Sequence, residues 1–378
     1  MRVLMIGRSY PESKTGMMGI FEFEQATALK KGGAEMVYLF CDTRSVKSLR
    51  KYGYTSLIKN NVPVYGFHLP IGGIFKGLFD RIKKAYFERA LKKAIEKEGI
   101  PDIIHIHFPL LAINEGILTL LQEYNRPLVA TEHWSRIQTK ELSKPQEEFL
   151  KRIVEETQAF ICVGDPLKQS VMELTQTKKD IYVVPNIVSP VFSYQGEKPS
   201  SQAFNFVTIG RLVGTKRINL LIDAFTKAFR NDPKVSLTIV GGGPLLRRYK
   251  RQIKRLGMED RIFTPGYLSS QDTARAINNS HAYVSASILE TFGVPFIEAM
   301  ACGKPVIGVR GGALDEYIDS SMGILVEGDN EEDLVEALKM MREDWESYDG
   351  KKISETAIEY FGAETVSRQI IDIYKSCL

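Results

Sequence analysis

Short apolar runs alternate with longer amphipathic stretches along the whole chain, and this alternation restricts the folds that the chain can adopt. A strand, a helix and a second strand form a parallel pair covered by the helix, so the repeated pattern predicts an α/β protein with doubly wound parallel sheets. The expected strands are 2–7, 35–41, 62–67, 102–107, 128–131, 159–163, 181–184, 205–210, 236–240, 261–264, 282–285, 305–308 and 323–325. The expected helices include 21–31, 79–98, 146–157, 219–230, 245–256, 294–302, 331–342 and 363–376.

The pattern stops once, at residues 189–202 (SPVFSYQGEKPSSQ), where Pro, Ser, Gly and charged residues show no periodicity. A chain of 378 residues also exceeds what one hydrophobic core usually supports. We therefore predict a Rossmann-like domain over 1–188, a linker over 189–202 and a second Rossmann-like domain over 203–362. The last helix, about 363–378, is expected to pack back on the first domain. Ligands should bind in the cleft between the domains, beyond the carboxyl ends of the strands.

The composition excludes several classes of protein. Apolar residues make up 44% and charged residues 25%, as in a globular protein rather than a disordered one. The net charge of +4 is too small for whole-molecule attraction to nucleic acid, so we expect no nucleic-acid partner. No apolar run approaches the ~20 residues that cross a bilayer, and the first residues resemble a buried strand, not a signal peptide. Four cysteines without metal-type spacing indicate reduced thiols in a soluble, cytoplasmic protein: Cys41, Cys162, Cys302 and Cys377.

The segment 290–303 (ETFGVPFIEAMACG) carries the most chemical information. Pro295 suits the first turn of a helix, and Gly303 suits a left-handed residue after its end. A short helix should therefore begin near Val294. Its free N–H groups and its dipole form an anion site, and Gly293 would let a phosphate approach the backbone closely.

Two carboxylates flank this anion site. Glu290 precedes the helix and Glu298 lies one turn inside it. Carboxylates are unsuited to binding an anion, but they suit hydroxyl groups on either side of a diphosphate. A single glutamate in such a place is more often a solvated surface acid. Here the helix start, Gly293 and the glycine cap occur together with correct spacing, and this combination favours a binding site.

A second segment, 206–225 (FVTIGRLVGTKRINLLIDAF), contains a strand, a loop and an amphipathic helix in that order. Its loop carries Arg211 and Lys216, and a fixed guanidinium beside a mobile ammonium suits a diphosphate leaving group. The loop is not a P-loop, because its glycine spacing differs and Arg217 rather than Ser or Thr follows the lysine. On its own, this pair is surface charge about as often as a binding site.

These segments resemble a known family. The sequence ETFGVPFIEAMACGKPVI is similar to the Glu-x7-Glu signature of the family-4 retaining glycosyltransferases, which have the two-domain GT-B fold. The resemblance implies that Glu298 binds the ribose of the donor and that Glu290 orients the transferred sugar. It also implies that Phe292, Gly293 and Val294 contact the donor.

The resemblance extends to other segments. It implies that Arg211 and Lys216 neutralise the donor diphosphate, that Leu268 lies near the base, and that the backbone at Gly19 meets the donor phosphates and sugar. Two departures are visible in this chain: Arg217 stands where a glycine is common, and Gly19 stands alone where the family usually has a glycine pair.

Three of the five histidines fall at strand ends: His105, His107 and His133. A histidine in such a place is more often structural than functional. The resemblance singles out His133, which matches a histidine that contacts the donor sugar or the reaction centre. His105 and His107 are expected to pack or to lie on the acceptor side, and His281 has no assigned role.

The resulting prediction is a retaining, hexosyltransferase-type enzyme of polysaccharide or glycolipid biosynthesis. It would move a sugar from a nucleotide-sugar donor, with UDP favoured by resemblance, to a glycan or lipid-linked acceptor. Catalytic roles are expected for His133, Glu290, Arg211 and Lys216, in a front-face reaction. No Asp-x-Asp motif occurs, so the protein's own cations should replace a metal, and no cofactor is expected. The alternatives are a sugar-nucleotide isomerase or epimerase of the same two-domain plan, and a non-catalytic nucleotide-sugar binder.

Residues 75–97 (FKGLFDRIKKAYFERALKKAIEK) contain eight basic residues against three acidic ones and two apolar rows at helical spacing. The first row consists of Phe75, Leu78, Phe79, Ile82 and Tyr86, and the second of Phe87, Leu91 and Ile95. One row can pack on the sheet, which leaves the other exposed unless something covers it. The segment therefore predicts either a basic amphipathic helix that docks on an anionic membrane or an ordinary crossover helix with a solvated face. In the first case the protein would be peripheral on the inner face of the membrane.

Overall fold

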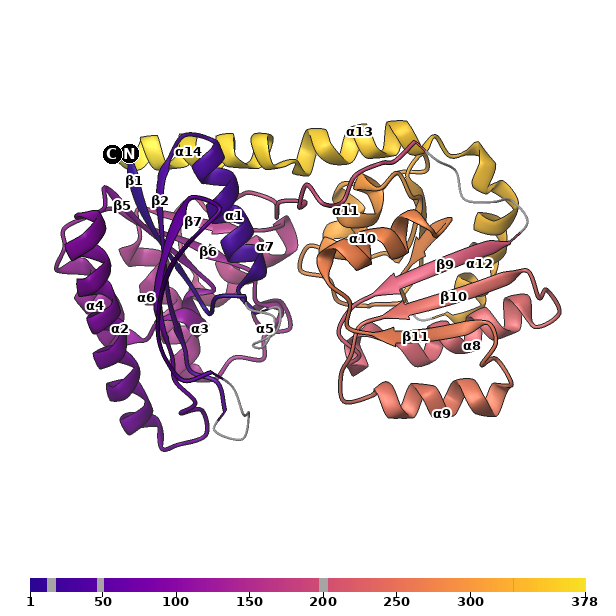
Figure 1. Cartoon of the computed structure of the whole chain (residues 1–378), viewed down its shortest axis with the longest axis horizontal. Helices are drawn as coiled ribbons and strands as arrows, with labels where there is room; N and C mark the ends of the chain where they lie inside the picture. The colour runs from indigo at the N-terminus through magenta and orange to yellow at the C-terminus, as the bar shows by residue number, and fades with distance from the viewer. Residues whose placement is uncertain (12–17, 46–50, 197–202, 329) are drawn as a thin grey trace. The chain divides into compact units, whose positions relative to one another are not determined.

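The computed structural model describes residues 1–11, 18–45, 51–196, 203–328 and 330–378. They form two compact units: unit 1 comprises Met1–Ile187 and Ala363–Leu378, and unit 2 comprises Val188–Gly362 (Figure 1). Residues 12–17 of the first loop and residues 197–202 of the predicted linker lie outside the described residues.

Unit 1 is built on an eight-stranded sheet with the order β3-β4-β2-β1-β5-β6-β7-β8. Its strands are β1 (Arg2–Gly7), β2 (Glu35–Asp42), β3 (Gly53–Lys59), β4 (Val62–His68), β5 (Ile103–His107), β6 (Leu128–Glu132), β7 (Ala159–Cys162) and β8 (Tyr182–Val183). Its helices are α1 (Ile20–Lys31), α2 (Lys76–Glu98), α3 (Pro109–Ala112), α4 (Glu115–Gln122), α5 (Ser135–Gln138), α6 (Lys144–Glu156), α7 (Asp165–Thr175) and α14 (Ala363–Cys377). The central strands are buried along their length, which explains their nearly continuous apolar runs.

The strand β3 is an addition to the strands expected from the sequence. It pairs with β4 in the antiparallel sense at the edge of the sheet, and Ser56, Ile58 and Lys59 are exposed, so it lacks a continuous apolar run. The turn into β4 consists of Asn60 and Asn61, both left-handed with φ of 52° and 60°. Two-residue hairpin turns favour Asn at such positions, so this pair is the sequence signal that marks the hairpin.

Unit 2 is built on a six-stranded parallel sheet with the order β11-β10-β9-β12-β13-β14. Its strands are β9 (Phe204–Ile209), β10 (Val235–Val240), β11 (Ile262–Gly266), β12 (Ala282–Val284), β13 (Val306–Val309) and β14 (Gly323–Val326). Its α-helices are α8 (Ile218–Phe229), α9 (Leu246–Leu256), α10 (Ser270–Asn278), α11 (Val294–Ala301), α12 (Glu331–Asp344) and α13 (Gly350–Phe361). Short 3₁₀ helices are η1 (Gly214–Lys216), η2 (Ala313–Glu316) and η3 (Trp345–Ser347).

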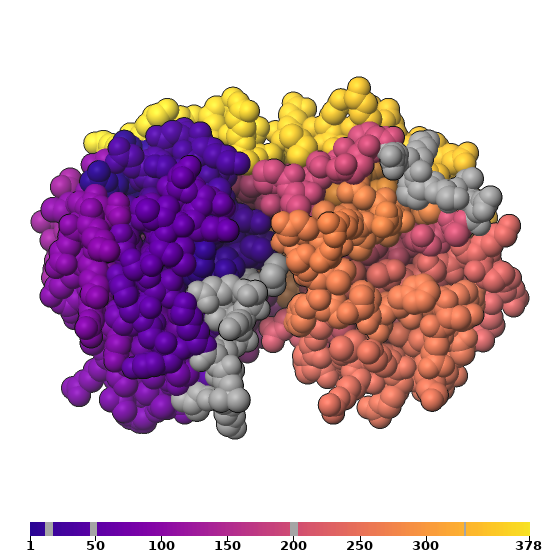
Figure 2. All heavy atoms as spheres, viewed as in Figure 1, coloured from indigo at the N-terminus to yellow at the C-terminus, as the bar shows by residue number. Residues whose placement is uncertain are grey.

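The boundaries of the units depend on packing. In α14 the side chains of Val366, Ile370 and Tyr374 are buried in the same core as Val3 and Leu29, so unit 1 is completed by the last residues of the chain. Figures 1 and 2 show this helix beside the amino-terminal residues. Residues 188–196, which include the first half of the predicted linker, belong to unit 2.

Each sheet has one point at which the strand order reverses. In unit 1, β1 lies between β2 and β5, and in unit 2, β9 lies between β10 and β12. Ligands of open α/β sheets bind beyond the carboxyl ends of the strands at such a point. The predicted fold class of two doubly wound, Rossmann-like domains is confirmed. Within the described part of the chain, no helix is both long and apolar enough to span a bilayer.

Candidate active site

The loop after β12 in unit 2 leads directly into α11. Gly293 is the N-cap residue of this helix, with φ of 87° and ψ of 48°, and Pro295 lies in its first turn. A Cβ at position 293 would lie 2.7 Å from Leu314 and 2.9 Å from the Tyr317 hydroxyl, so backbone conformation and packing both require glycine. The helix therefore begins at Val294, where the anion site was predicted, with the unpaired N–H groups of a helix start.

Phe292 anchors the same loop. Its side chain is buried, and its carbonyl oxygen accepts a hydrogen bond of 2.7 Å from the Tyr317 hydroxyl. Its ring also packs edge-on against Phe361, with 5.5 Å between the ring centroids. Because the side chain and the carbonyl are both engaged, the backbone N–H of Phe292 is the group that a donor could use.

Lys216 and Glu290 are brought together although 74 positions separate them. The Lys216 Nζ donates to Glu290 Oε1 at 2.5 Å, and both side chains are mostly buried. The backbone also joins the two segments, since the Ile288 N–H and the Ser287 hydroxyl both lie 3.4 Å from the Thr215 carbonyl oxygen. An ammonium has three donors, so Lys216 can hold Glu290 and still bind a phosphate oxygen.

Glu298 lies half-buried on α11. Both Glu298 and Glu290 act electrostatically on the same side chain, Tyr283. Burial raises the pKa of Tyr283 well above its ordinary value, and the carboxylates of Glu290 and Glu298 raise it further. Tyr283 therefore lies within electrostatic reach of both acids. Sequence reasoning missed this residue because it belongs to the apolar run of β12.

Arg211 is exposed on the loop that follows β9. The strand β9 is the neighbour of β12 in the sheet. The glycines after β10 hold this loop in place. The Leu212 N–H donates to the Gly242 carbonyl at 2.9 Å, and a Cβ at Gly243 would lie 2.5 Å from the Leu212 carbonyl oxygen. The consecutive glycines thus permit close packing of backbone on backbone, and this packing fixes the start of the Arg211 loop.

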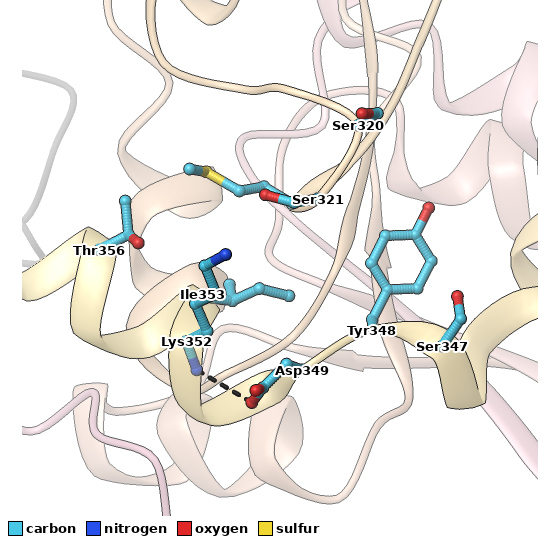
Figure 3. Close-up of a pocket in the computed structure, with 9 residues that line it drawn as sticks. Ser320, Ser321, Ser347, Tyr348, Asp349, Lys352, Ile353 and Thr356 are labelled. Carbon is cyan, nitrogen blue, oxygen red and sulfur yellow. Dashed lines mark hydrogen bonds between the residues drawn. The ribbon is translucent and has the colours of Figure 1, made fainter.

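Leu268 is half-buried just after β11, and its neighbour Tyr267 donates its hydroxyl to the Gly242 carbonyl at 3.0 Å. A separate hollow of about 320 Å³ lies between residues 320–322 and the start of α13, with Lys352 N–H donating to Asp349 Oδ1 at 3.1 Å (Figure 3). It adjoins the residues that precede β14, so it lies at the amino edge of the sheet, away from the loops just described.

In unit 1 the predicted residue Gly19 is the N-cap of α1, with φ of 90°. A Cβ at this position would collide with the carbonyl of Ser9, so only glycine allows the loop after β1 to approach the helix start this closely. Gly19 is buried, and its carbonyl accepts from the Phe23 N–H at 3.0 Å.

His133 follows β6 and is half-buried. Its Nε2 lies 3.1 Å from His107 Nδ1, and its ring stacks on Phe108 with 4.4 Å between the centroids. Burial, together with the nearby positive charge of Arg8, lowers the pKa of His133 to about 3, so this imidazole is neutral at physiological pH. It can therefore make hydrogen bonds to a sugar, but it does not carry the additional proton of an imidazolium.

Two other histidines are structural. His105 is fully buried between the Tyr374 hydroxyl at 2.6 Å and the Thr131 hydroxyl at 2.7 Å. His281 accepts from the Asn205 N–H through Nδ1 at 3.1 Å. These contacts explain why both positions need polar ring atoms inside a core.

The comparisons with known proteins identify the family of the chain. Residues 23–192 match the family model described as Glycosyltransferase Family 4, and residues 195–359 match the model described as Glycosyl transferases group 1. An uncharacterised glycosyltransferase of Methanocaldococcus jannaschii is 30% identical over 288 residues, which cover 75% of each chain. The chain belongs to the family-4 glycosyltransferases.

Other similar proteins have lower sequence identity to this chain. The N-acetyl-α-D-glucosaminyl L-malate synthase of Bacillus anthracis is 26% identical, over 76% of this chain and 78% of that protein. The gpi3 protein of the Schizosaccharomyces pombe phosphatidylinositol N-acetylglucosaminyltransferase is 27% identical over 52% of this chain, and the match spans only 43% of its own length. The structures of a sucrose-phosphate synthase from Thermosynechococcus elongatus and of Anabaena HepE with UDP and glucose share the GT-B fold. Their TM-scores are 0.76 and 0.75, at 20% and 18% identity, with 98% or more of each chain covered.

Two residues of this glycosyltransferase's unit 1 escaped sequence reasoning. Arg8 follows β1, and its Nε donates to Glu22 Oε1 at 2.7 Å. Glu132 is fully buried at the end of β6, where its Oε1 accepts from the N–H groups of His133 and Trp134 at 2.8 and 2.9 Å. Glu132 therefore shapes the backbone that presents His133. Neither residue has a local motif, because each acts through neighbours distant in sequence or through burial.

The buried carboxyl of Glu132 makes the stability of the protein depend on pH. Burial raises its pKa from 4.5 to about 7, although the two backbone N–H groups oppose this shift. Between these values the folded protein keeps a proton that the unfolded chain has released, so the contribution of Glu132 to stability falls as pH rises. Relative to wild type, Glu132→Gln should gain roughly 3 kcal/mol of unfolding free energy across that window.

Urea denaturation below pH 4.5 and above pH 7 measures this difference. The buried histidines titrate in both proteins, so their contribution cancels in the comparison. The exposed Glu141→Gln is the matched control and should show no such trend. A difference between Glu132→Gln and wild type that stays constant with pH would contradict the prediction.

The structure corrects part of the interpretation of residues 75–97. Phe75 and Leu78 are exposed, at 82% and 52%, but Phe87 and Leu91 of the second row are fully buried. The second row thus packs in the core, as one row was expected to do, and the other row is partly covered, since Phe79, Ile82 and Tyr86 are half-buried. Uncovered apolar side chains of this row are confined to Phe75 and Leu78 at the start of α2. Lys83, counted as a surface cation, is also buried, and its Nζ donates to the Leu111 carbonyl at 2.8 Å.

Proposed function

We propose that this family-4 enzyme transfers a sugar from a UDP-sugar to a glycan or lipid-linked acceptor with retention of configuration and without a metal ion. The observation that carries the proposal is the Lys216–Glu290 pair beside the start of α11, at the switch point of unit 2. A cation, a carboxylate and a helix start lie together here, and in the proposed function they would bind the diphosphate and a sugar hydroxyl.

In the proposed reaction the acceptor hydroxyl oxygen bonds to the anomeric carbon while the bond from that carbon to the diphosphate oxygen breaks. The leaving diphosphate takes the hydroxyl proton on the same face of the sugar, so configuration is retained. Lys216, Arg211 and the N–H groups at the start of α11 stabilise the growing negative charge. Glu298 would bind the ribose hydroxyls, Glu290 would orient the sugar, and the neutral His133 would hold a sugar hydroxyl.

The names of the relatives suggest the donor to test first. Several are named for an N-acetylglucosaminyl group, and HepE was solved with UDP. We therefore expect UDP-N-acetylglucosamine or UDP-glucose to bind, with UDP itself binding nearly as well. Calorimetric titration with these compounds, with ADP and GDP as matched controls, tests the choice of nucleotide. Equal affinity for all three nucleotides would remove UDP as the preferred one.

Transfer itself separates the proposal from the two alternatives. With a panel of glycan and lipid acceptors, UDP should be released only when an acceptor is present, and NMR of the product should show the anomeric configuration of the donor. An isomerase or epimerase would change the donor sugar without any acceptor. A non-catalytic binder would bind the donor and release nothing.

The proposed metal independence predicts that EDTA leaves the rate of transfer largely unchanged, because Arg211 and Lys216 supply the positive charge at the diphosphate. Assays of the full chain with EDTA, and with Mg²⁺ or Mn²⁺ added back, measure this. A strict requirement for either ion would overturn the metal-free mechanism while leaving the glycosyltransferase activity intact.

For the acceptor side, we propose docking of unit 1 on an anionic membrane through the start of α2. Phe75 and Leu78 are exposed there, with the exposed cations Lys76 and Arg81 beside them in sequence. A groove of about 840 Å³ runs along the same helix, with a lining that mixes apolar side chains such as Phe79 with cationic ones. Such a lining suits a lipid-linked acceptor with a charged headgroup.

Liposome co-sedimentation should show binding that requires anionic lipid and weakens with salt. Replacing Lys76, Arg81 and Lys84 by Gln should weaken it about 100-fold, since each cation near an anionic leaflet contributes about 1 kcal/mol. The helix α9 provides the matched control, because it carries exposed cations and no acid: Arg247, Arg248, Lys250, Arg251, Lys254 and Arg255. If replacement of these α9 cations by Gln abolishes binding and the α2 variant still binds, the proposal that the start of α2 docks on the membrane is wrong.

A further inference from the structure

The switch point of unit 1 holds an arginine in one fixed orientation. Arg8 is the first residue after β1, and its Nε donates to the fully buried carboxylate of Glu22 at 2.7 Å. Its guanidinium carbon lies 3.3 Å from the centroid of the Phe108 ring, which follows β5. The side chain of Arg8 is 19% exposed. These two contacts fix the plane of the guanidinium. The opposite edge, which carries Nη1 and Nη2, makes no hydrogen bond to the described residues.

Phe108 is held in a strained conformation. Its φ is 48° in the left-handed region, which is rare for a bulky residue, and Pro109 follows it. Strain of this kind gathers at functional sites. Here it places one aromatic ring against both Arg8 and His133, which comes from the third strand of the group, β6. Three loops from neighbouring strands therefore converge on the ring.

The outer edge of Arg8 suits an anionic ligand by its geometry. His107 and His133 are neutral at physiological pH, because burial lowers the pKa of each. Glu22 compensates the charge of Arg8 in the folded core, and it approaches through Nε, not through the outer edge. A second carboxyl, that of Glu132, is within electrostatic reach of Arg8, and burial raises its pKa to about 7. A planar guanidinium edge with two N–H donors matches a carboxylate or a phosphate in a bidentate arrangement.

We propose that Arg8 and Phe108 form an oxyanion site, and that the acceptor carries a carboxylate or phosphate group which binds there. The assignment to the acceptor rests on the proposed function, but the anion site itself does not. The donor diphosphate is assigned to Arg211 and Lys216 of unit 2, so a second cation in unit 1 is available for the other substrate. The enzyme would then select acceptors by their charge, and His133 would lie beside the reacting hydroxyl.

NMR of the full chain tests the site directly. The Nε–H of Arg8, held by a buried carboxylate, gives a side-chain resonance that Arg8→Lys identifies by its loss, and the indole N–H of Trp134 reports on the His133 loop. Each is followed during titration with malonate and with inorganic phosphate, in the presence of saturating UDP. Both resonances should shift and saturate with at least one of the two anions.

The variants are chosen so that loss of folding cannot imitate loss of binding. The double variant Arg8→Gln/Glu22→Gln removes both charges and leaves no unpaired buried carboxylate, and it should weaken anion binding about 10- to 100-fold by the Trp134 resonance. Arg8→Lys keeps the charge without the planar edge and should weaken it less. Arg2→Gln, at the other end of β1 in an exposed pair with Glu35, is the matched control.

Each outcome decides the proposal. Saturable shifts that disappear in the double variant support it. Absence of shifts with both anions overturns it. A response of Arg8 to UDP that blocks any further effect of malonate and phosphate also overturns it, because Arg8 would then bind the donor. If UDP fails to bind at all, the proposed function fails, while the malonate and phosphate titrations still report on Arg8.

Discussion

Alanine at Lys216 or at Arg211 should lower kcat by about 10²–10³ and change the donor KM much less, as expected for groups that stabilise charge at the leaving diphosphate. The geometry makes Lys216 the stronger case. Its Nζ lies 2.5 Å from Glu290 Oε1, and both side chains are mostly buried. The ammonium is therefore held in position before the donor binds. Negative charge on the diphosphate grows as the bond breaks, and a fixed cation is therefore worth more in the transition state than in the ground state.

Steady-state kinetics with the donor identified by calorimetry measures both constants. The matched control is Lys227→Ala, which removes an ion-paired but exposed lysine of the same unit, bonded to Glu332. That variant should keep normal rates. Near-normal kcat in both Lys216→Ala and Arg211→Ala would show that the leaving group is stabilised elsewhere, and the proposed mechanism would be wrong.

Glu298→Ala should raise the donor Kd about 10- to 100-fold without unfolding unit 2. Hydrogen bonds to a charged acceptor contribute roughly 1.5–3 kcal/mol, and Glu298 lies half-buried on α11, one turn from the helix start. The loss should be the same for UDP and for the UDP-sugar, because the ribose belongs to both. Glu290→Ala should instead weaken the UDP-sugar more than UDP, since Glu290 is assigned to the sugar.

Calorimetry with the two ligands separates the two glutamates in one experiment. The exposed Glu259→Ala is the control in unit 2. Retention of wild-type affinity for UDP in Glu298→Ala would remove this residue from the ribose site. A thermal unfolding scan of each variant shows whether a change in affinity comes from lost structure.

The features that could be predicted from the sequence are those decided by residues close together in the chain. Apolar periodicity and the single interruption at 189–202 were enough to predict two doubly wound sheets, because each strand and helix must bury one face whatever its neighbours are. The start of α11 was predictable for a similar reason, since Gly293 and Pro295 set backbone angles locally. The edge strand β3 was missed because exposure removes the apolar run that marks a strand.

Other features depended on which strands are neighbours, and local patterns do not encode this. The pairing of Lys216 with Glu290 follows from β9 lying beside β12, and the cluster of Arg8, Phe108 and His133 follows from β1, β5 and β6 being adjacent. Burial could not be predicted from local patterns either. In the sequence Lys83 resembles the other surface cations of its helix, but in the structure it is buried and donates to the Leu111 carbonyl. The sequence by itself determined the buried strands, the main helices and the chemistry of the loops. The tertiary structure decided which charges meet, because contacts between distant segments depend on sheet order and on the exclusion of water around them.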